Sequence, residues 1–135
     1  MIYLLLIFLF LSVTLFVLFW LLQGKIGKRK QTYYISNWNK ILSKFESGSE
    51  YWYSAILEAD NLLDEALIAA KFKGKTIGER LVAANRHFSD PNSVWKAHKI
   101  KSALNEKNKD KLKKTHAMAA IRGYKRALKD LGVIG

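Results

Sequence analysis

Cysteine is absent from this chain of 135 residues, so disulfides, thiolate metal sites and cysteine nucleophiles are excluded. Charge is absent from its first 22 residues, because all 23 Lys and Arg and all 11 Asp and Glu come after Leu22. The chain therefore joins an apolar N-terminal stretch to a basic remainder that carries the whole net charge of +12. That remainder is long enough to bury the modest core of one small domain.

The apolar stretch, Met1 to Leu22, has the length and composition of a transmembrane helix. As an α-helix it would be about 33 Å long, against a hydrocarbon core of about 30 Å. Tyr3 and Trp20 lie near its two ends, where amphipathic rings favour the membrane interface. The hydroxyls of Ser12 and Thr14 are expected to bond backbone carbonyls of the preceding turn. A cleaved signal peptide would have a basic start and small residues before the cut, and the stretch has neither.

A basic cluster follows the apolar stretch and predicts its orientation. Its members are Lys25, Lys28, Arg29 and Lys30. The positive-inside bias places the N-terminus outside and the rest of the chain in the cytoplasm. The cluster is also expected to contact anionic lipid headgroups, at about 1 kcal/mol per charge. Because Gly24 and Gly27 interrupt it, residues 23–31 are expected to form a basic juxtamembrane connector before a helical domain at 32–135.

Residues 32–135 show helical periodicity and no strand-like alternation of useful length. Ser47-Gly48-Ser49 is a break, Thr76 to Glu79 is a capping box, and Asp90-Pro91 is an N-cap followed by a proline suited to the first helical turn. Gly132 is suited to end the last helix. The expected helices span residues 32–46, 50–71, 76–87, 90–104 and 111–131. The predicted fold is all-α, with a transmembrane helix followed by a small up-and-down bundle of four to five helices.

The second expected helix, 50–71, has the clearest two-sided pattern. Its predicted core face comprises Trp52, Ile56, Ala59, Leu63, Ala66 and Leu67. Its acidic side chains are expected to lie largely elsewhere, and they are Glu58, Asp60, Asp64 and Glu65. Asp60 and Asp64 stand one turn apart and could bind a cation. Pairing of these solvated acids with the basic fourth and fifth helices is the favoured interpretation.

Positive charge is concentrated in the last two expected helices. Residues 96–130 contain twelve Lys or Arg against three acids, a net of +9. Such a basic region favours polyanions or anionic lipid, although a solvated helix face near a membrane would have the same composition. The candidate polyanion-binding residues are Lys96, Lys99, Lys111, Lys113 and Lys114.

Several stretches together resemble a group of uncharacterised bacterial proteins, often with one N-terminal membrane helix, whose soluble part is HEPN-like. The stretches are Trp52 to Leu67, Gly78-Glu79-Arg80-Leu81, Trp95 to Lys101, and Tyr124 to Ile134. The resemblance covers roughly residues 36 to 134. It implies a helical bundle related to nucleotide-binding proteins and dimeric, metal-independent ribonucleases.

The ribonuclease motif that the resemblance implies is degenerate in this chain. Lys101 stands where the motif has Arg, Asn105 stands where it has His, and Glu106 is retained. Asn cannot exchange a proton near neutral pH as His does, and Lys lacks the bidentate fork of Arg. His98, one turn before Lys101, is a candidate replacement base, although a structural role for it is favoured.

No cofactor or metal site is expected. The three histidines, His87, His98 and His116, have no metal-ligand spacing. Gly74-Lys75-Thr76 imitates the end of a phosphate-binding loop but lacks the earlier glycine and the preceding strand. The expected function is a non-catalytic, membrane-anchored interaction module that forms a homodimer or binds a protein partner. The alternatives are an RNA- or nucleotide-binding protein and a residual ribonuclease.

Overall fold

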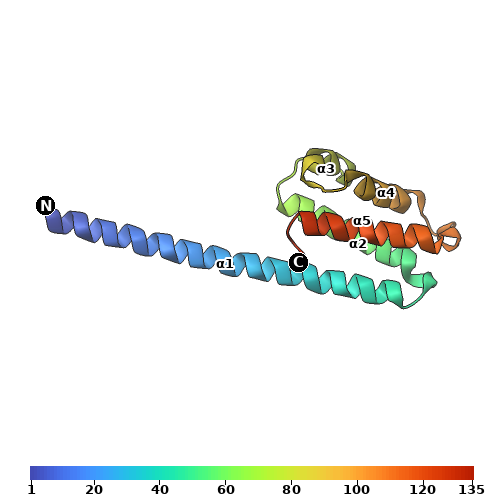
Figure 1. The fold of residues 1–135 in the computed structure, drawn as a ribbon, viewed down its shortest axis with the longest axis horizontal. Helices are drawn as coiled ribbons and strands as arrows, with labels where there is room; N and C mark the ends of the chain where they lie inside the picture. The colour runs from blue at the N-terminus through green and yellow to red at the C-terminus, as the bar shows by residue number, and fades with distance from the viewer. The chain divides into compact units, whose positions relative to one another are not determined.

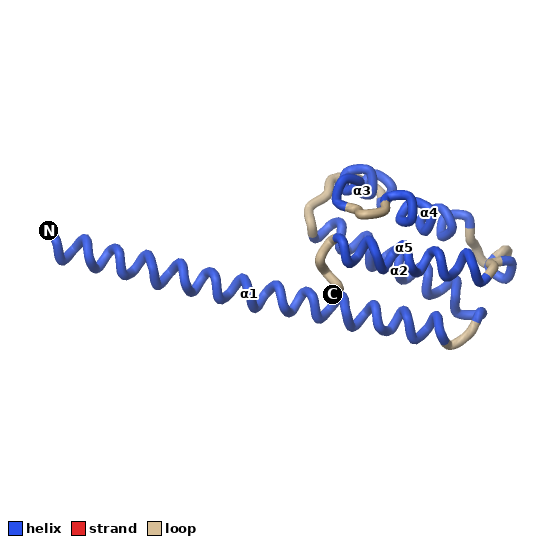
Figure 2. Tube along the Cα trace, viewed as in Figure 1, coloured by secondary structure: helices blue, strands red, loops and turns tan.

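A computed structural model describes residues 1–22 and 30–135, while the side chains of residues 23–29 lie outside the described residues. The described chain is helical and contains no strand (Figure 2). It divides into two units, Met1–Tyr33 and Tyr34–Gly135, and each is described by itself. The all-α prediction is confirmed.

The first unit lies within helix α1, Ile2–Glu46. Its stretch Ile2–Leu22 is long and apolar enough to cross a membrane, and the side chains of this stretch are exposed rather than packed. Ser12 donates to the Leu9 carbonyl at 2.8 Å and Thr14 to the Leu11 carbonyl at 2.9 Å, as expected for hydroxyls in an apolar helix. The predicted connector, residues 23–31, lies within α1, so the helix continues where a separate connector was expected, and the side chains of residues 23–29 lie outside the described residues.

The second unit is a bundle made of the last turns of α1 and four further helices. These are α2 (Trp52–Ala69), α3 (Ile77–Ala84), α4 (Pro91–Ala103) and α5 (Lys114–Asp130). Short 3₁₀ turns lie at Ser49–Tyr51, Asn85–His87 and Lys109–Lys111. Each predicted helix is present. The first continues from the N-terminal helix instead of starting near residue 32, and α5 starts at Lys114, three residues after its predicted start.

The helix ends show why the chain turns where it does. Gly48, with φ 143°, follows the end of α1 in a conformation that L side chains rarely adopt. Thr76 accepts a hydrogen bond from the Glu79 amide at 3.2 Å, and Asp90 accepts one from the Ser93 amide at 3.2 Å. Both predicted N-caps are therefore confirmed. Lys71, with φ 65°, takes the left-handed conformation after α2 that glycine usually occupies.

Helix α5 is the centre of the bundle, because it packs against both α2 and α4 (Figure 1). Its buried face follows the predicted stripe, with Ala117, Ala120, Ile121, Tyr124 and Leu128 all in the core. Gly123 lies between them and faces α4. A Cβ atom at this position would stand 2.5 Å from the backbone oxygen of Ser93, so the two helices approach closely only because position 123 lacks a side chain.

We expect Gly123→Ala to lower the free energy of unfolding by about 1–3 kcal/mol, because the new methyl group collides with backbone rather than with a mobile side chain. This loss outweighs the gain of about 1 kcal/mol that Ala normally brings to a helix interior. Gly78→Ala is the matched control, since its Cβ meets nothing closer than 3.8 Å. Urea unfolding of the full chain in detergent measures both. A Gly123→Ala protein as stable as the Gly78→Ala protein would contradict the close approach.

Candidate functional site

Asp60 of α2 is the buried polar centre of the bundle, with only 2% of its surface exposed. The Tyr124 hydroxyl of α5 donates to its Oδ1 at 2.8 Å, and His98 Nδ1 of α4 lies 3.0 Å from the same oxygen. Lys101 Nζ, one turn further along α4, lies 3.3 Å from Oδ2. One carboxylate therefore joins side chains from three helices.

The protonation states in this cluster follow from burial and hydrogen bonding. Burial by itself raises the pKa of Asp60, but the hydrogen bonds from His98 and Tyr124 and the nearby positive charges outweigh it and hold that pKa below its usual range. Burial and the adjacent carboxylate raise the pKa of the Tyr124 hydroxyl. Asp60 is thus an anion that accepts hydrogen bonds, and Tyr124 is a neutral donor.

The cluster fixes the orientation of the His98 ring. An ionised Asp60 requires a hydrogen on His98 Nδ1, so Nε2 is the nitrogen left to accept a proton when the ring is neutral. The ring edge also contacts Trp95, with centroids 6.2 Å apart. Only 15% of the His98 side chain and 28% of the Lys101 side chain are exposed. Both candidate catalytic side chains are therefore held by the protein's own carboxylate.

The structure separates the four candidate residues His98, Lys101, Asn105 and Glu106 into two places. His98 and Lys101 lie together on α4, as predicted from their spacing, and both contact Asp60. Asn105 lies beyond α4, where its side chain accepts from the Lys107 and Asn108 amides. Glu106 is exposed and pairs with Lys109 at 2.6 Å. The hydrogen bonds of Asn105 and Glu106 are confined to their own loop.

The prediction for the acids of α2 was partly wrong. Asp60 does pair with the basic fourth and fifth helices, but it is buried in the core rather than solvated. Asp64 instead binds Arg80 of α3 through two hydrogen bonds, at 2.7 and 2.9 Å. Glu58 pairs with Lys44 near the surface. The sequence pattern predicts that an acid at position 60 is exposed to solvent. Asp60 is buried instead because donors from three side chains surround its carboxylate, and these donors lie on helices that periodicity does not relate to α2.

The predicted polyanion-binding lysines are all exposed, and they are Lys96, Lys99, Lys111, Lys113 and Lys114. The structure adds a feature that the sequence reading missed, a stripe of cations along one face of α5. We call it the α5 stripe; it consists of Lys114, Met118, Arg122, Lys125 and Lys129. The spacings of four, four, three and four residues keep these side chains on one face over about 22 Å. No ion pair within residues 30–135 involves its four cations.

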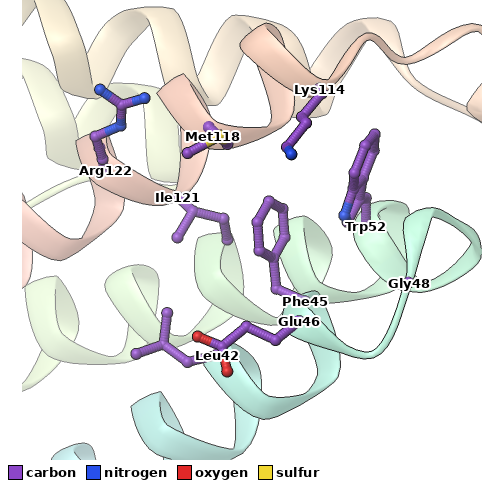
Figure 3. A pocket seen from close by; sticks show the side chains of 9 residues that line it. All are labelled: Leu42, Phe45, Glu46, Gly48, Trp52, Lys114, Met118, Ile121 and Arg122. Atoms are coloured by element: carbon purple, nitrogen blue, oxygen red, sulfur yellow. The ribbon is translucent and has the colours of Figure 1, made fainter.

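The α5 stripe borders a hollow of about 450 Å³ between the end of α1, the start of α2 and α5 (Figure 3). The walls are mainly apolar and aromatic, and they include Leu42, Phe45, Trp52, Met118 and Ile121. The Phe45 and Trp52 rings are stacked with centroids 5.8 Å apart. Figure 3 shows the Lys114 amine directed toward these rings and Glu46 on the opposite side. The volume lies in the range of small-molecule sites, about 300–1,000 Å³.

A second hollow of about 270 Å³ lies further along the same two helices, and Leu42 lines both. Its polar side chains are those of Trp38, Asn39, Lys125 and Lys129, none of them acidic, and Gly135 also lines it. Trp38 is buried, and within the described residues its Nε1 has no hydrogen-bond partner. An unpaired buried donor costs about 1–3 kcal/mol. The two hollows together form what we call the α1–α5 groove.

Three further predictions concern lipid headgroups, metal ions and a phosphate-binding loop. Lys25, Lys28 and Arg29, the proposed headgroup contacts, lie outside the described residues, and Lys30 is exposed. In residues 1–22 and 30–135, no three His, Asp or Glu side chains are grouped as metal ligands. Helix α2, and no strand, precedes Gly74-Lys75-Thr76, and Thr76 is a helix cap. This agrees with the rejection of a phosphate-binding loop.

Comparison of the chain with protein-family models, with curated proteins and with solved structures gives no match. A function can therefore be inferred only from the chemistry of the Asp60 cluster and of the α1–α5 groove.

We expect Asp60→Ala to lower the free energy of unfolding by about 3 kcal/mol, because it leaves the buried Tyr124 hydroxyl and two nitrogenous side chains without their acceptor. Glu58→Ala is the control, since it removes the same charge from the same helix. Its ion pair with Lys44 is about two-fifths exposed, and such pairs contribute about 0–1 kcal/mol. Equal losses in urea unfolding would contradict a central role for Asp60.

The contribution of Asp60 to the free energy of unfolding should also depend on pH. Because the pKa of Asp60 is lower in the folded chain, its stabilising effect is present above the unfolded value of about 3.9 and is lost as pH falls below it. Unfolding midpoints of the wild type and of Asp60→Asn, measured from neutral pH down to pH 3, should therefore converge in acid. A stability difference that stays constant over that range would show that the Asp60 charge is not what stabilises the fold.

Proposed function

We propose that this chain is a single-pass membrane protein whose helical bundle is a non-catalytic interaction module on the cytoplasmic face. Its anchor is residues 1–22, and its binding surface is the α1–α5 groove with the cationic α5 stripe. The HEPN-like ancestry of the bundle, with the RNA-cleaving pair lost, belongs to the same proposal. The partner class that this surface favours is anionic and partly apolar.

The observation that carries the proposal is the contrast between two sets of cationic side chains. His98 and Lys101, the groups best suited to chemistry, are held by the buried carboxylate of Asp60. The four cations of the α5 stripe have no such partner within residues 30–135, and they border apolar hollows. Groups that are already paired stabilise the fold, whereas unpaired charges beside apolar surface favour recognition of an external ligand.

The membrane part of the proposal is supported by composition. Ile2–Leu22 is apolar and long enough to span a bilayer. Basic residues follow it directly, which favours a cytoplasmic position for everything after them. The basic bundle would then lie in the compartment that contains the anionic inner leaflet and cytoplasmic anions.

A reporter fused after Gly135 tests the membrane part. An enzyme that is active only in the cytoplasm should be active in this fusion, and the product should stay in membranes washed with alkaline carbonate. Changing Lys25, Lys28, Arg29 and Lys30 to Gln is the control, because it removes the charge bias that sets orientation. Activity of an exported reporter in the unchanged protein would overturn the topology.

RNA binding is the second candidate, and the exposure of all five predicted polyanion-binding lysines favours it. If it is correct, changing Lys111, Lys113 and Lys114 to Glu should weaken binding of single-stranded RNA by at least about tenfold, and the wild-type affinity should fall steeply with added salt. Exposed Lys71, Lys73 and Lys75, changed to Glu, are the matched control at equal charge. Filter binding at two salt concentrations measures both. Equal affinities of the two triple variants would exclude the predicted face.

A further inference from the structure

We propose that the α1–α5 groove binds a single-chain anionic amphiphile, such as a fatty acid, with its charged head at Lys125 and Lys129 and its apolar chain in the larger hollow. This inference names the ligand class of the interaction surface, and so it rests on the proposed function. It is carried by the different linings of the two hollows, which share Leu42 as a lining residue.

The smaller hollow has the lining expected for an anionic head. Its polar side chains are the two ammonium groups of Lys125 and Lys129, the amide of Asn39 and the indole of Trp38. The two lysines are one turn apart on α5, so their amines can converge on one group. No acidic side chain lines this hollow, and no ion pair within residues 30–135 neutralises either lysine. Gly135 also lines the hollow, and two ammonium groups beside its single carboxylate leave a net positive charge that an anionic head would offset.

The larger hollow has the lining expected for an apolar chain. Leu42, Phe45, Trp52, Met118 and Ile121 supply most of its wall, and its 450 Å³ is the size of a ligand site (Figure 3). The stacked rings of Phe45 and Trp52 form one side and the α5 stripe borders the other. A long chain that enters from the Lys125 side would follow the groove past Leu42 into this space. Burial of its methylene groups drives the binding.

Charge complementarity favours this ligand over a second copy of the chain. The groove is lined by four cationic side chains, by Glu46 and by Gly135 with its terminal carboxylate, so its net charge is positive. Two copies that met through this face would bring eight cations together, and like charges in contact destabilise an interface. An acidic amphipathic helix has suitable charge, but the apolar volume lies between the end of α1, the start of α2 and α5, with Leu42 and Phe45 in its wall. A slender chain fills such a space better than a helix about 10 Å wide.

The test uses the full chain in nanodiscs of zwitterionic lipid and a long-chain fatty acid that carries a photoactivatable diazirine. After illumination, mass spectrometry maps the labelled peptides. We expect label in Ile2–Leu22, which reports contact with the bilayer, and label around Leu42 and Met118, which reports the groove. The unlabelled fatty acid should displace the groove label, whereas its uncharged methyl ester should displace it poorly. Delivery from albumin, compared with delivery in the nanodisc lipid, distinguishes a soluble source from a membrane source.

Two pairs of variants sharpen the test. Lys125→Gln with Lys129→Gln should reduce the groove label by at least about tenfold, because charge-assisted contacts to the head are lost. Lys96→Gln with Lys99→Gln removes the same charge from α4 and should leave the label unchanged. Met118→Trp should block the larger hollow, and Val82→Trp on exposed α3 is its control. Circular dichroism and urea unfolding confirm that each variant is folded, so that a lost label reports lost binding.

Each outcome counts for or against the inference. Label confined to Ile2–Leu22, full displacement by the methyl ester, or an unchanged label in Lys125→Gln with Lys129→Gln would each overturn it. A photoadduct to an added acidic peptide in place of the fatty acid would assign the groove to a protein partner. A groove label without any label in Ile2–Leu22 would support the ligand site but contradict the membrane part of the proposed function. The two proposals can therefore fail separately.

Discussion

The bundle depends on one buried carboxylate. Asp60 carries a charge in a place where an unpaired charge would be prohibitively unfavourable, and it is tolerated there because donors from α4 and α5 surround it. The interaction determines the relative register of the helices as well as contributing to stability. A hydroxyl, an imidazole and an ammonium group reach one carboxyl together only when α2, α4 and α5 are in correct register. The network therefore helps to specify one packing of helices that are otherwise rich in small, interchangeable alanines.

The same network decides which residues are available for function. The sequence resemblance directs attention to the end of α4, and His98 and Lys101 there do come together. Their common partner, however, comes from the inside of the fold rather than from a substrate. The residues left over are the cations of the α5 stripe, which face the last turns of α1 across apolar side chains. The proposed binding surface therefore lies at the α1–α5 groove and not at His98 and Lys101.

The helix pattern was predictable because it depends on local chemistry. The Thr76 and Asp90 caps and the break at Gly48 depend on residues close together in the chain, and the apolar face of α5 follows from the spacing of its side chains. The candidate sites were predictable only in part. Asp60 sits on α2 at a position where the pattern of charges indicates solvent, and only the donors on distant helices make it a core residue. Likewise, the α5 stripe becomes a groove wall only when α1 is placed beside it.

The groove also depends on the fold rather than on one motif. Its two walls come from segments about 80 residues apart in the chain, Ile35 to Glu46 and Lys114 to Lys129. The sequence pattern places the tryptophans of the groove on apolar helix faces, as for ordinary core residues. Trp38 is indeed buried and Trp52 is half-buried. What distinguishes them is the space that remains between the helices. Side-chain periodicity cannot report such a space, because the same pattern also describes a filled core.

The division of the Asp60 cluster among three helices constrains how the protein can change. Replacing the acid alone strands a tyrosine hydroxyl, a histidine and a lysine, whereas replacing any one donor weakens support for a buried charge. An apolar substitute would be tolerated only if positions 60, 98, 101 and 124 changed as a set. In a collection of related chains, these four positions should therefore co-vary, with the acid and its donors retained together or lost together.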